Sequence, residues 1–258
     1  MARTNQNGFT LVELAIVLMI IGLLIGGILR GQELMDNAQV SATIQQVTSY
    51  DGARLTFMDA YSMLPGDVST AASRIPGCET GNANACRSGD GDGLIGVPVT
   101  VPWNDAVPDI DSENTQFWKH LALTHMISGV TPSAADPDWG SSHPVAKIGG
   151  GFFIQNYNRP SNTVLPGHYL LLRKTITGKW DCGAASGSRN IETCTISPRR
   201  AVQMDRKMDD GIALTGSVLA ISAAYSRGCG NANAGENDAS GYAEGKDSAS
   251  CDMAFRIM

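Results

Sequence analysis

The sequence predicts an α+β protein in which a long N-terminal helix packs on an antiparallel β-sheet, with loop insertions and disulfides. Three observations predict it. Residues 9–63 contain no proline and carry apolar residues at helical spacing. Residues 149–157 and 168–173 are apolar and aromatic, as in β-strands. Six cysteines follow the helical part, in a chain of 258 residues that is long enough for one sizeable domain.

The chain begins with a polar segment and an apolar run. Residues 9–29 contain a single charge, Glu13, and about 20 apolar residues at ~1.5 Å rise span the ~30 Å core of a bilayer. The eight residues ahead of the run carry one positive charge, Arg3, which favours a cytoplasmic N-terminus. We therefore expect residues 9–30 to form a single-pass membrane helix.

Glu13 is the unusual residue of this run. A carboxylate inside a spanning helix costs at least ~2.5 kcal/mol on insertion scales, so it needs a partner or a role. No Lys, Arg or His lies between Arg3 and Arg30. A cut after Gly8 would create a positive α-amine on Phe9, one helical turn from Glu13 or within reach of Glu13 in a neighbouring chain. The pairing would work only in a processed protein.

A specific motif surrounds this expected cut: Gly8-Phe9-Thr10-Leu11-Val12-Glu13. It resembles the class III processing site of type IV pilins and of the pseudopilins of type II secretion, and the resemblance covers residues 1–66. The resemblance implies a pilin-like fold and a leader peptide, residues 1–8, that a prepilin peptidase removes before methylating the Phe9 amine. It also implies a filament subunit in which Glu13 recruits the next subunit by meeting its N-terminal amine.

Two simpler interpretations of the apolar run explain less. A secretory signal peptide would place a small-residue cleavage site after the run. Gly26, Gly27 and Gly31 are small, but they form no A-x-A pattern, and Glu13 fits such a region badly. A plain signal anchor explains the length and leaves Glu13 without a partner.

The resemblance also implies partners and a location. The partners are the prepilin peptidase, like or related pilin subunits, the inner membrane and an inner-membrane assembly platform. The chain would lie in the bacterial inner membrane before assembly and in a periplasmic or cell-surface filament afterwards. A net charge of −6 without a basic patch argues against a direct nucleic-acid partner.

The helix is expected to continue beyond the membrane. Over residues 31–63 apolar side chains recur mostly at three- and four-residue steps, which predicts an amphipathic half that packs on a globular head formed by residues 64–258. Pro65 and Gly66 are expected to end it.

Residues 64–110 form an irregular insertion rich in Gly, Pro, Asn and Asp. Within it, residues 88–93 place Asp90 and Asp92 at alternate positions, as a calcium-binding loop begins. The third alternate ligand and the distal Glu of an EF-hand are missing, whereas related pseudopilins carry a calcium in a loop of the head. A calcium site at Asp90 and Asp92 and a plain Asp-Gly turn both stay open.

The remaining elements follow from capping and alternation signals. We expect a short helix over residues 112–123, the two strands named above, a second short helix over residues 199–208 and a strand over residues 212–222. The acidic trio at the end of the second short helix has three interpretations: a cation site, a cap of the following strand, or a solvated helix end. The trio is Asp205, Asp209 and Asp210.

The cysteines are even in number, which fits an oxidising compartment. Six cysteines allow 15 connectivities, and nearest-neighbour pairing is a preference. Their spacings do not match zinc knuckles. A bridge at the C-terminal end would close a tail rich in Gly, Asn, Ala and Ser, which by analogy with pilins is expected on the filament surface. The preferred pairs are Cys78 with Cys86, Cys182 with Cys194, and Cys229 with Cys251.

The sequence shows no constellation for catalysis. It contains no G-x-S-x-G motif, and its four histidines are scattered. We therefore expect a substrate of a peptidase and not an enzyme, without a cofactor other than the candidate calcium. The competing hypothesis, from another class of protein, is a monomeric membrane-anchored binding module of the periplasm.

Overall fold

The structure, a computed structural model, describes residues 10–78, 86–96, 109–157, 165–176, 182, 194–220, 229–230, 241–245 and 248–257. The chain divides into two compact units, Met1–Gln39 and Val40–Met258.

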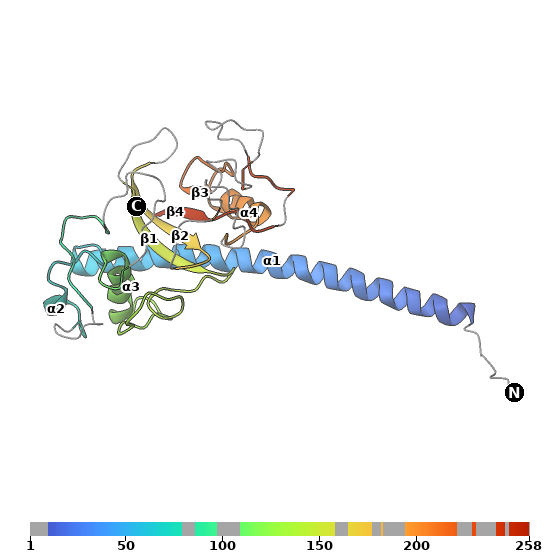
Figure 1. The fold of residues 1–258 in the computed structure, drawn as a ribbon, viewed down its shortest axis with the longest axis horizontal. Helices are drawn as coiled ribbons and strands as arrows, with labels where there is room; N and C mark the ends of the chain where they lie inside the picture. The colour runs from blue at the N-terminus through green and yellow to red at the C-terminus, as the bar shows by residue number, and fades with distance from the viewer. Residues whose placement is uncertain are drawn as a thin grey trace. The chain divides into compact units, whose positions relative to one another are not determined.

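Helices and strands together confirm the predicted α+β class (Figure 1). In the described part of the chain, a long helix comes first, and a four-stranded antiparallel sheet with three shorter helices follows. In chain order the elements are α1 (Leu11–Tyr61), α2 (Ala71–Arg74), α3 (Glu113–Leu123), β1 (Gly151–Tyr157), β2 (Gly167–Arg173), α4 (Pro198–Met208), β3 (Val218–Ala220) and β4 (Met253–Ile257).

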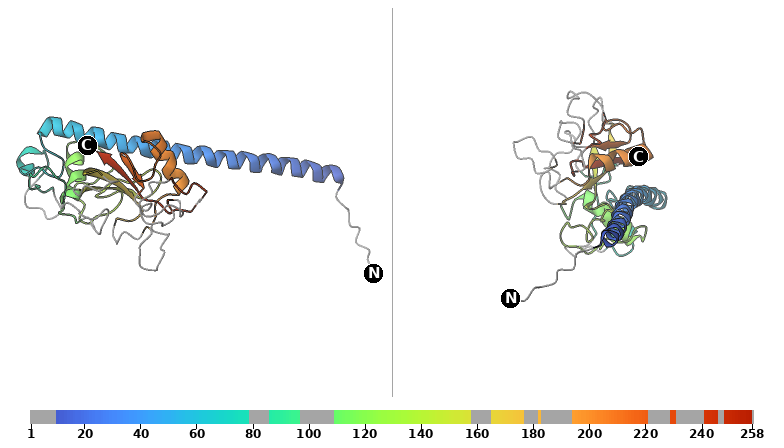
Figure 2. Two further views of the ribbon diagram at one scale, coloured as in Figure 1. Left: turned by 90° about the horizontal axis from the view of Figure 1, so that it is seen from above. Right: turned by 90° about the vertical axis from the view of Figure 1, so that its right-hand side faces the viewer.

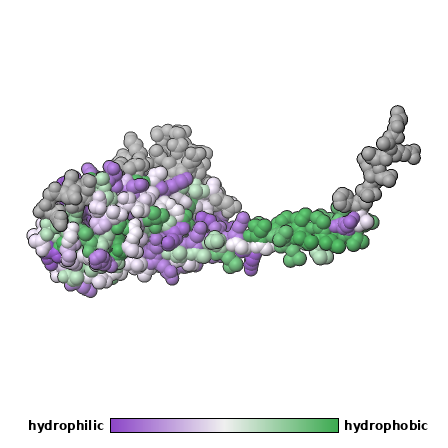
Figure 3. Space-filling view, turned by 90° about the horizontal axis from the view of Figure 1, so that it is seen from below, coloured by the Kyte–Doolittle hydropathy of each residue, from purple (hydrophilic) through white to green (hydrophobic). Residues whose placement is uncertain are grey.

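The first unit consists of the N-terminal part of α1. Residues 11–29 are all exposed, and apolar side chains cover this part of the helix (Figure 3). Within the described residues, α1 is the one helix that is long and apolar enough to cross a membrane. Its composition is therefore compatible with anchoring in an inner membrane.

Helix α1 ends at Tyr61, before the predicted proline stop. Ser62 adopts a left-handed conformation (φ 58°), which turns the chain out of the helix. The turn at Pro65-Gly66 then follows, and Gly66 has φ 89°. A Cβ at Gly66 would lie 2.5 Å from the carbonyl oxygen of Glu113, so this position requires glycine.

The sheet has the strand order β1-β2-β4-β3, and every neighbouring pair is antiparallel. Alternate residues define its two faces. One face belongs to the main core, which includes α1 from Val40 onward, where the helix runs along the sheet (Figure 2). Tyr50 on α1 packs edge-on against Phe152 on β1 with ring centroids 5.4 Å apart. The other face forms a second buried cluster whose cross-strand row runs through Phe153, Leu171, Ala254 and Leu219.

Two predicted strands differ from the observed ones. Strand β1 begins at Gly151 because Gly149 (φ 110°) and Gly150 (φ 68°) are not extended. In the predicted strand over residues 212–222, the structure forms strand only at Val218–Ala220, and residues 221–222 lie outside the described part. Helices α3 and α4 form as predicted, with Ser112 and Ser197 at their N-cap positions. Helix α2 was not predicted and lies within residues 64–110, which were expected to be irregular.

Candidate functional site

The predicted processing site lies at the start of α1. Gly8 and Phe9 precede the described residues, which begin at Thr10. Glu13, the predicted assembly residue, lies in the first turn of α1.

Thr10 and Glu13 bond to each other reciprocally. The backbone N–H and the hydroxyl of Thr10 both donate to Glu13 Oε2, each at 2.9 Å. The Glu13 N–H lies 3.3 Å from Thr10 Oγ1, and the Thr10 carbonyl accepts the Leu14 N–H at 3.3 Å. This is a capping box, with Thr10 at the N-cap and Glu13 three residues later. The role of Thr10 was not anticipated, although T-x-x-E before an apolar run is the sequence signal for it.

The environment of this pair is apolar. Thr10 and Glu13 are the only residues with polar side chains in residues 10–29. A carboxylate in such a helix needs hydrogen-bond donors, and here the first turn supplies two of them.

Comparison with models of protein families identifies this segment. Residues 3–29 match the model described as the prokaryotic N-terminal methylation motif. The chain carries a pilin-type methylation signal. This agrees with the class III signal of type IV pilins and pseudopilins, and the matched range includes Gly8, Phe9 and Glu13. Comparisons with curated proteins and with solved structures gave no match.

Beyond the pilin-type signal, the head contains a candidate calcium loop at residues 86–96. Asp67, in the turn after α1, holds this loop through both carboxylate oxygens. Oδ1 accepts the N–H of Gly91 at 2.6 Å, and Oδ2 accepts the N–H of Gly93 at 2.8 Å. Burial raises the pKa of Asp67 despite these bonds, and neighbouring carboxylates add to the rise.

Glu113, at the start of α3, holds the same loop from another side. Its Oε1 accepts the N–H of Asp90 at 2.9 Å, and its Oε2 accepts the N–H of Gly96 at 2.7 Å. Burial raises the pKa of Glu113 as well. Carboxylate oxygens of Asp67, Asp90 and Glu113 lie within 4.8 Å of one another. Hard oxygen ligands at this spacing fit a calcium ion.

Asp92 is not part of this three-carboxylate cluster. It accepts the N–H of Leu94 at 2.8 Å and donates its own N–H to Asp90 Oδ1 at 3.1 Å. These are the bonds of Asx turns, the plain-turn alternative. A calcium ion at Asp90 therefore has Asp67 and Glu113 as nearby ligands, and calcium binding itself stays a prediction.

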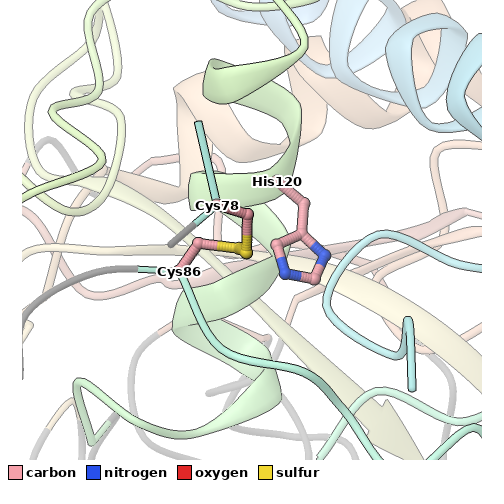
Figure 4. Close-up of side chains that lie close together, drawn as sticks. All are labelled: Cys78, Cys86 and His120. Carbon is pink, nitrogen blue, oxygen red and sulfur yellow. A yellow bond between two sulfur atoms is a disulfide. The ribbon is translucent and has the colours of Figure 1, made fainter. Parts of the chain in front are cut away.

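Another cluster of side chains in the head consists of Cys78, Cys86 and His120 (Figure 4). The two sulfurs form a disulfide, so neither is a free thiolate. His120 Nδ1 accepts the N–H of Gly66 and Nε2 donates to the carbonyl of Arg87, both at 2.9 Å. Burial lowers the pKa of His120 to about 4, which keeps the ring neutral. With both sulfurs and both nitrogens engaged, this cluster is structural.

The other cysteines also form the preferred local pairs. The structure joins Cys182 to Cys194 and Cys229 to Cys251. Described parts of the C-terminal tail are docked on the head: Tyr242 is buried, and its hydroxyl donates to Asp205 Oδ2 on α4 at 2.6 Å. The expected exposure of this tail on a filament concerns mainly residues 231–240, which lie outside the described part.

In the acidic trio at the end of α4, Asp209 caps the following strand, and Asp205 is buried, so it is not a solvated helix end. Carboxylate oxygens of Asp205, Asp209 and Asp210 lie within 4.8 Å of one another, and a cation site there stays a prediction. Asp209 Oδ2 accepts the N–H groups of Ser217 and Val218 at the start of β3. Asp210 Oδ1 accepts the N–H of Ile212 at 2.8 Å. Through Asp209, the end of α4 is bonded to the start of β3.

One Ser–His contact bears on the question of catalysis. Ser142 Oγ lies 2.9 Å from His143 Nδ1, but both side chains have no exposed surface. Burial lowers the pKa of His143 to about 3. A substrate has no access to this pair in the folded head.

Proposed function

We propose that this chain is a structural subunit, a pilin or pseudopilin, that is cut after Gly8 and methylated at Phe9. It then assembles into a type IV pilus or a type II secretion pseudopilus. The observation that carries the proposal is the methylation motif over residues 3–29, with Glu13 in the first turn of an apolar helix.

Assembly on this proposal uses one ion pair and one apolar surface. The Phe9 amine of one subunit meets Glu13 of a neighbour, and a charge pair of this kind is far stronger in an apolar surrounding than in water. Residues 14–29 supply the apolar surface, and their three glycines, Gly22, Gly26 and Gly27, let helices approach closely. The neighbour is a like or related subunit, added by an inner-membrane assembly platform.

The head supports the helix in this role. The second half of α1 packs into the main core, and three disulfides suit a periplasmic or extracellular location. A calcium ion at Asp67, Asp90 and Glu113 is a separate proposal, which rests on the donor set alone.

Intact-mass and N-terminal peptide mass spectrometry of the protein from its native membrane or sheared surface fraction tests the proposal. We expect a mature chain that starts at a methylated Phe9 and is six hydrogens lighter for its three disulfides. A chain that still starts at Met1 and occurs only as a monomer would contradict it and would favour the membrane-anchored binding module.

A further inference from the structure

The Glu13 carboxylate at the start of α1 has two different partners under the proposed function. Thr10 bonds Glu13 within the chain, whereas assembly requires Glu13 to meet the amine of another chain. Since these two are the only polar side chains of residues 10–29, no other side chain in the apolar helix can bond Glu13 instead.

The hydroxyl of Thr10 matters because of this apolar surrounding. A buried polar group without a partner is costly. A carboxylate that loses the Thr10 hydroxyl therefore takes a backbone donor from a neighbouring chain, because the first N–H groups of a helix have no partner within it. Polar side chains that bond across helices drive helix association in membranes. When Glu13 is hydrogen-bonded within its own chain, the self-association of uncut chains is therefore weaker.

We propose that Thr10 is a positioning residue that holds the Glu13 carboxylate within the uncut chain until cleavage supplies a cation to replace it. This inference rests on the proposed function. The Thr10 hydroxyl is a neutral donor, whereas a Phe9 amine adds the Coulomb attraction of a full positive charge, which is far stronger in an apolar surrounding than in water. A Phe9 amine consequently displaces Thr10 from Glu13, and cleavage converts a monomeric precursor into a subunit ready for assembly.

The test uses the full uncut chain, without peptidase or assembly platform. Chains carrying donor or acceptor fluorophores at the C-terminus are reconstituted in phosphatidylcholine vesicles, and energy transfer measures their self-association. Thr10→Val keeps the β-branched shape and removes the hydroxyl, whereas Thr10→Ser keeps the hydroxyl. We expect Thr10→Val to raise self-association about three- to tenfold, the range of hydrogen bonds between membrane helices, and Thr10→Ser to leave it unchanged.

A second background separates positioning from a general effect on the helix. With Glu13→Leu in place, Thr10→Val should no longer change self-association, because the hydroxyl acts through the carboxylate. Equal self-association of Thr10→Val and the parent chain, or the same increase with and without Glu13, would overturn the inference. If native chains are cut and assembled but Thr10→Val leaves self-association in vesicles unchanged, only the role of Thr10 is refuted. Native chains that are never cut would refute the proposed function, whatever the vesicles show.

Discussion

His120 and Gly66 are joined by a buried hydrogen bond in which the Gly66 N–H donates to Nδ1 over 2.9 Å. This bond fixes the turn after α1 to α3, and the other ring nitrogen holds Arg87 beside the Cys78–Cys86 disulfide. Because a protonated imidazole has no free lone pair, the link depends on a neutral ring.

His120 should make the head sensitive to acid. Its pKa is about 4 in the folded head, below the usual 6.5, so the unfolded chain binds a proton first as the pH falls. The stability that His120 contributes is therefore present above about pH 6.5 and is lost as the pH falls through about 4. His120→Gln cannot take up this proton, and its thermal unfolding midpoint should fall less than that of the parent between about pH 7 and pH 4.5.

The matched control for this change is His125→Gln, because His125 is exposed. The control should follow the parent curve. Identical pH profiles for His120→Gln and the parent would show that His120 does not couple protonation to unfolding.

Asp205 should act in the opposite direction. Burial raises its pKa to about 6 from the usual 3.8, so the folded head binds this proton more tightly than the unfolded chain does. The associated stability is complete below about pH 4 and is lost as the pH rises through about 6. Asp205→Asn stays neutral. As the pH rises from about 5 to about 8, the thermal unfolding midpoint of this variant should rise relative to that of the parent. The control is Asp59→Asn, on the exposed face of α1, whose unfolding midpoint should differ from that of the parent by the same amount at every pH. A pH-independent difference for Asp205→Asn as well would contradict the prediction.

Glu13→Ala should separate cutting from assembly. The peptidase site at Gly8 and Phe9 is unchanged, so we expect a mature chain by mass spectrometry and few or no filaments by electron microscopy. Glu33→Ala is the control, since Glu33 is also exposed on α1 but pairs with Arg30 at 3.1 Å. Normal filaments from the Glu13→Ala chain would remove Glu13 from the assembly mechanism.

Gly8 substitutions should block cutting itself. Gly8→Ala or a larger residue is expected to leave the chain starting at Met1, detected as an uncut peptide. Efficient cleavage of these variants at the same bond would refute the assignment of the processing site.

The Cys229–Cys251 disulfide should stabilise the head more than Cys78–Cys86 does. It closes a longer loop, 22 residues against 8, and the chain-entropy model gives about 3 kcal/mol for loops near the longer length. Replacing Cys229 and Cys251 together by Ala should lower the free energy of unfolding in denaturant by about that amount. A larger loss from the Cys78 and Cys86 pair would show that loop length does not govern these bridges.

Calcium should raise the unfolding midpoint if the three-carboxylate cluster binds it. A ligand that binds only the folded state stabilises that state by mass action. Calcium is compared with a chelator for the parent, for Asp67→Asn and for Asp136→Asn, an exposed control. Calcium should raise the unfolding midpoint of the parent and of the control, and it should leave that of Asp67→Asn unchanged. No shift in the parent would show the calcium prediction to be wrong.

Much of the head followed from local signals. Ser112 and Ser197-Pro198 marked the starts of two helices, because the preference for serine at the N-cap position and for proline at the first helical position is local in the chain. Neither serine makes a side-chain capping hydrogen bond. The apolar and aromatic runs at residues 149–157 and 168–173 correspond to β1 and β2, because this signal too is local in the chain. Within the described residues, the strand predicted over residues 212–222 formed only at Val218–Ala220. The alternation pattern also gave no sign that Asp209 bonds the amides of Ser217 and Val218.

The sequence by itself determined the N-terminal part, an apolar helix whose one carboxylate lies within a methylation motif. Length, polarity and a contiguous motif need no fold to be recognised. Only the tertiary structure decided which distant groups meet. It brought Asp67 and Glu113 to the loop of Asp90, and Tyr242 to Asp205. These partners lie 23 to 37 residues apart, and such pairs form only when the core closes and brings their elements together.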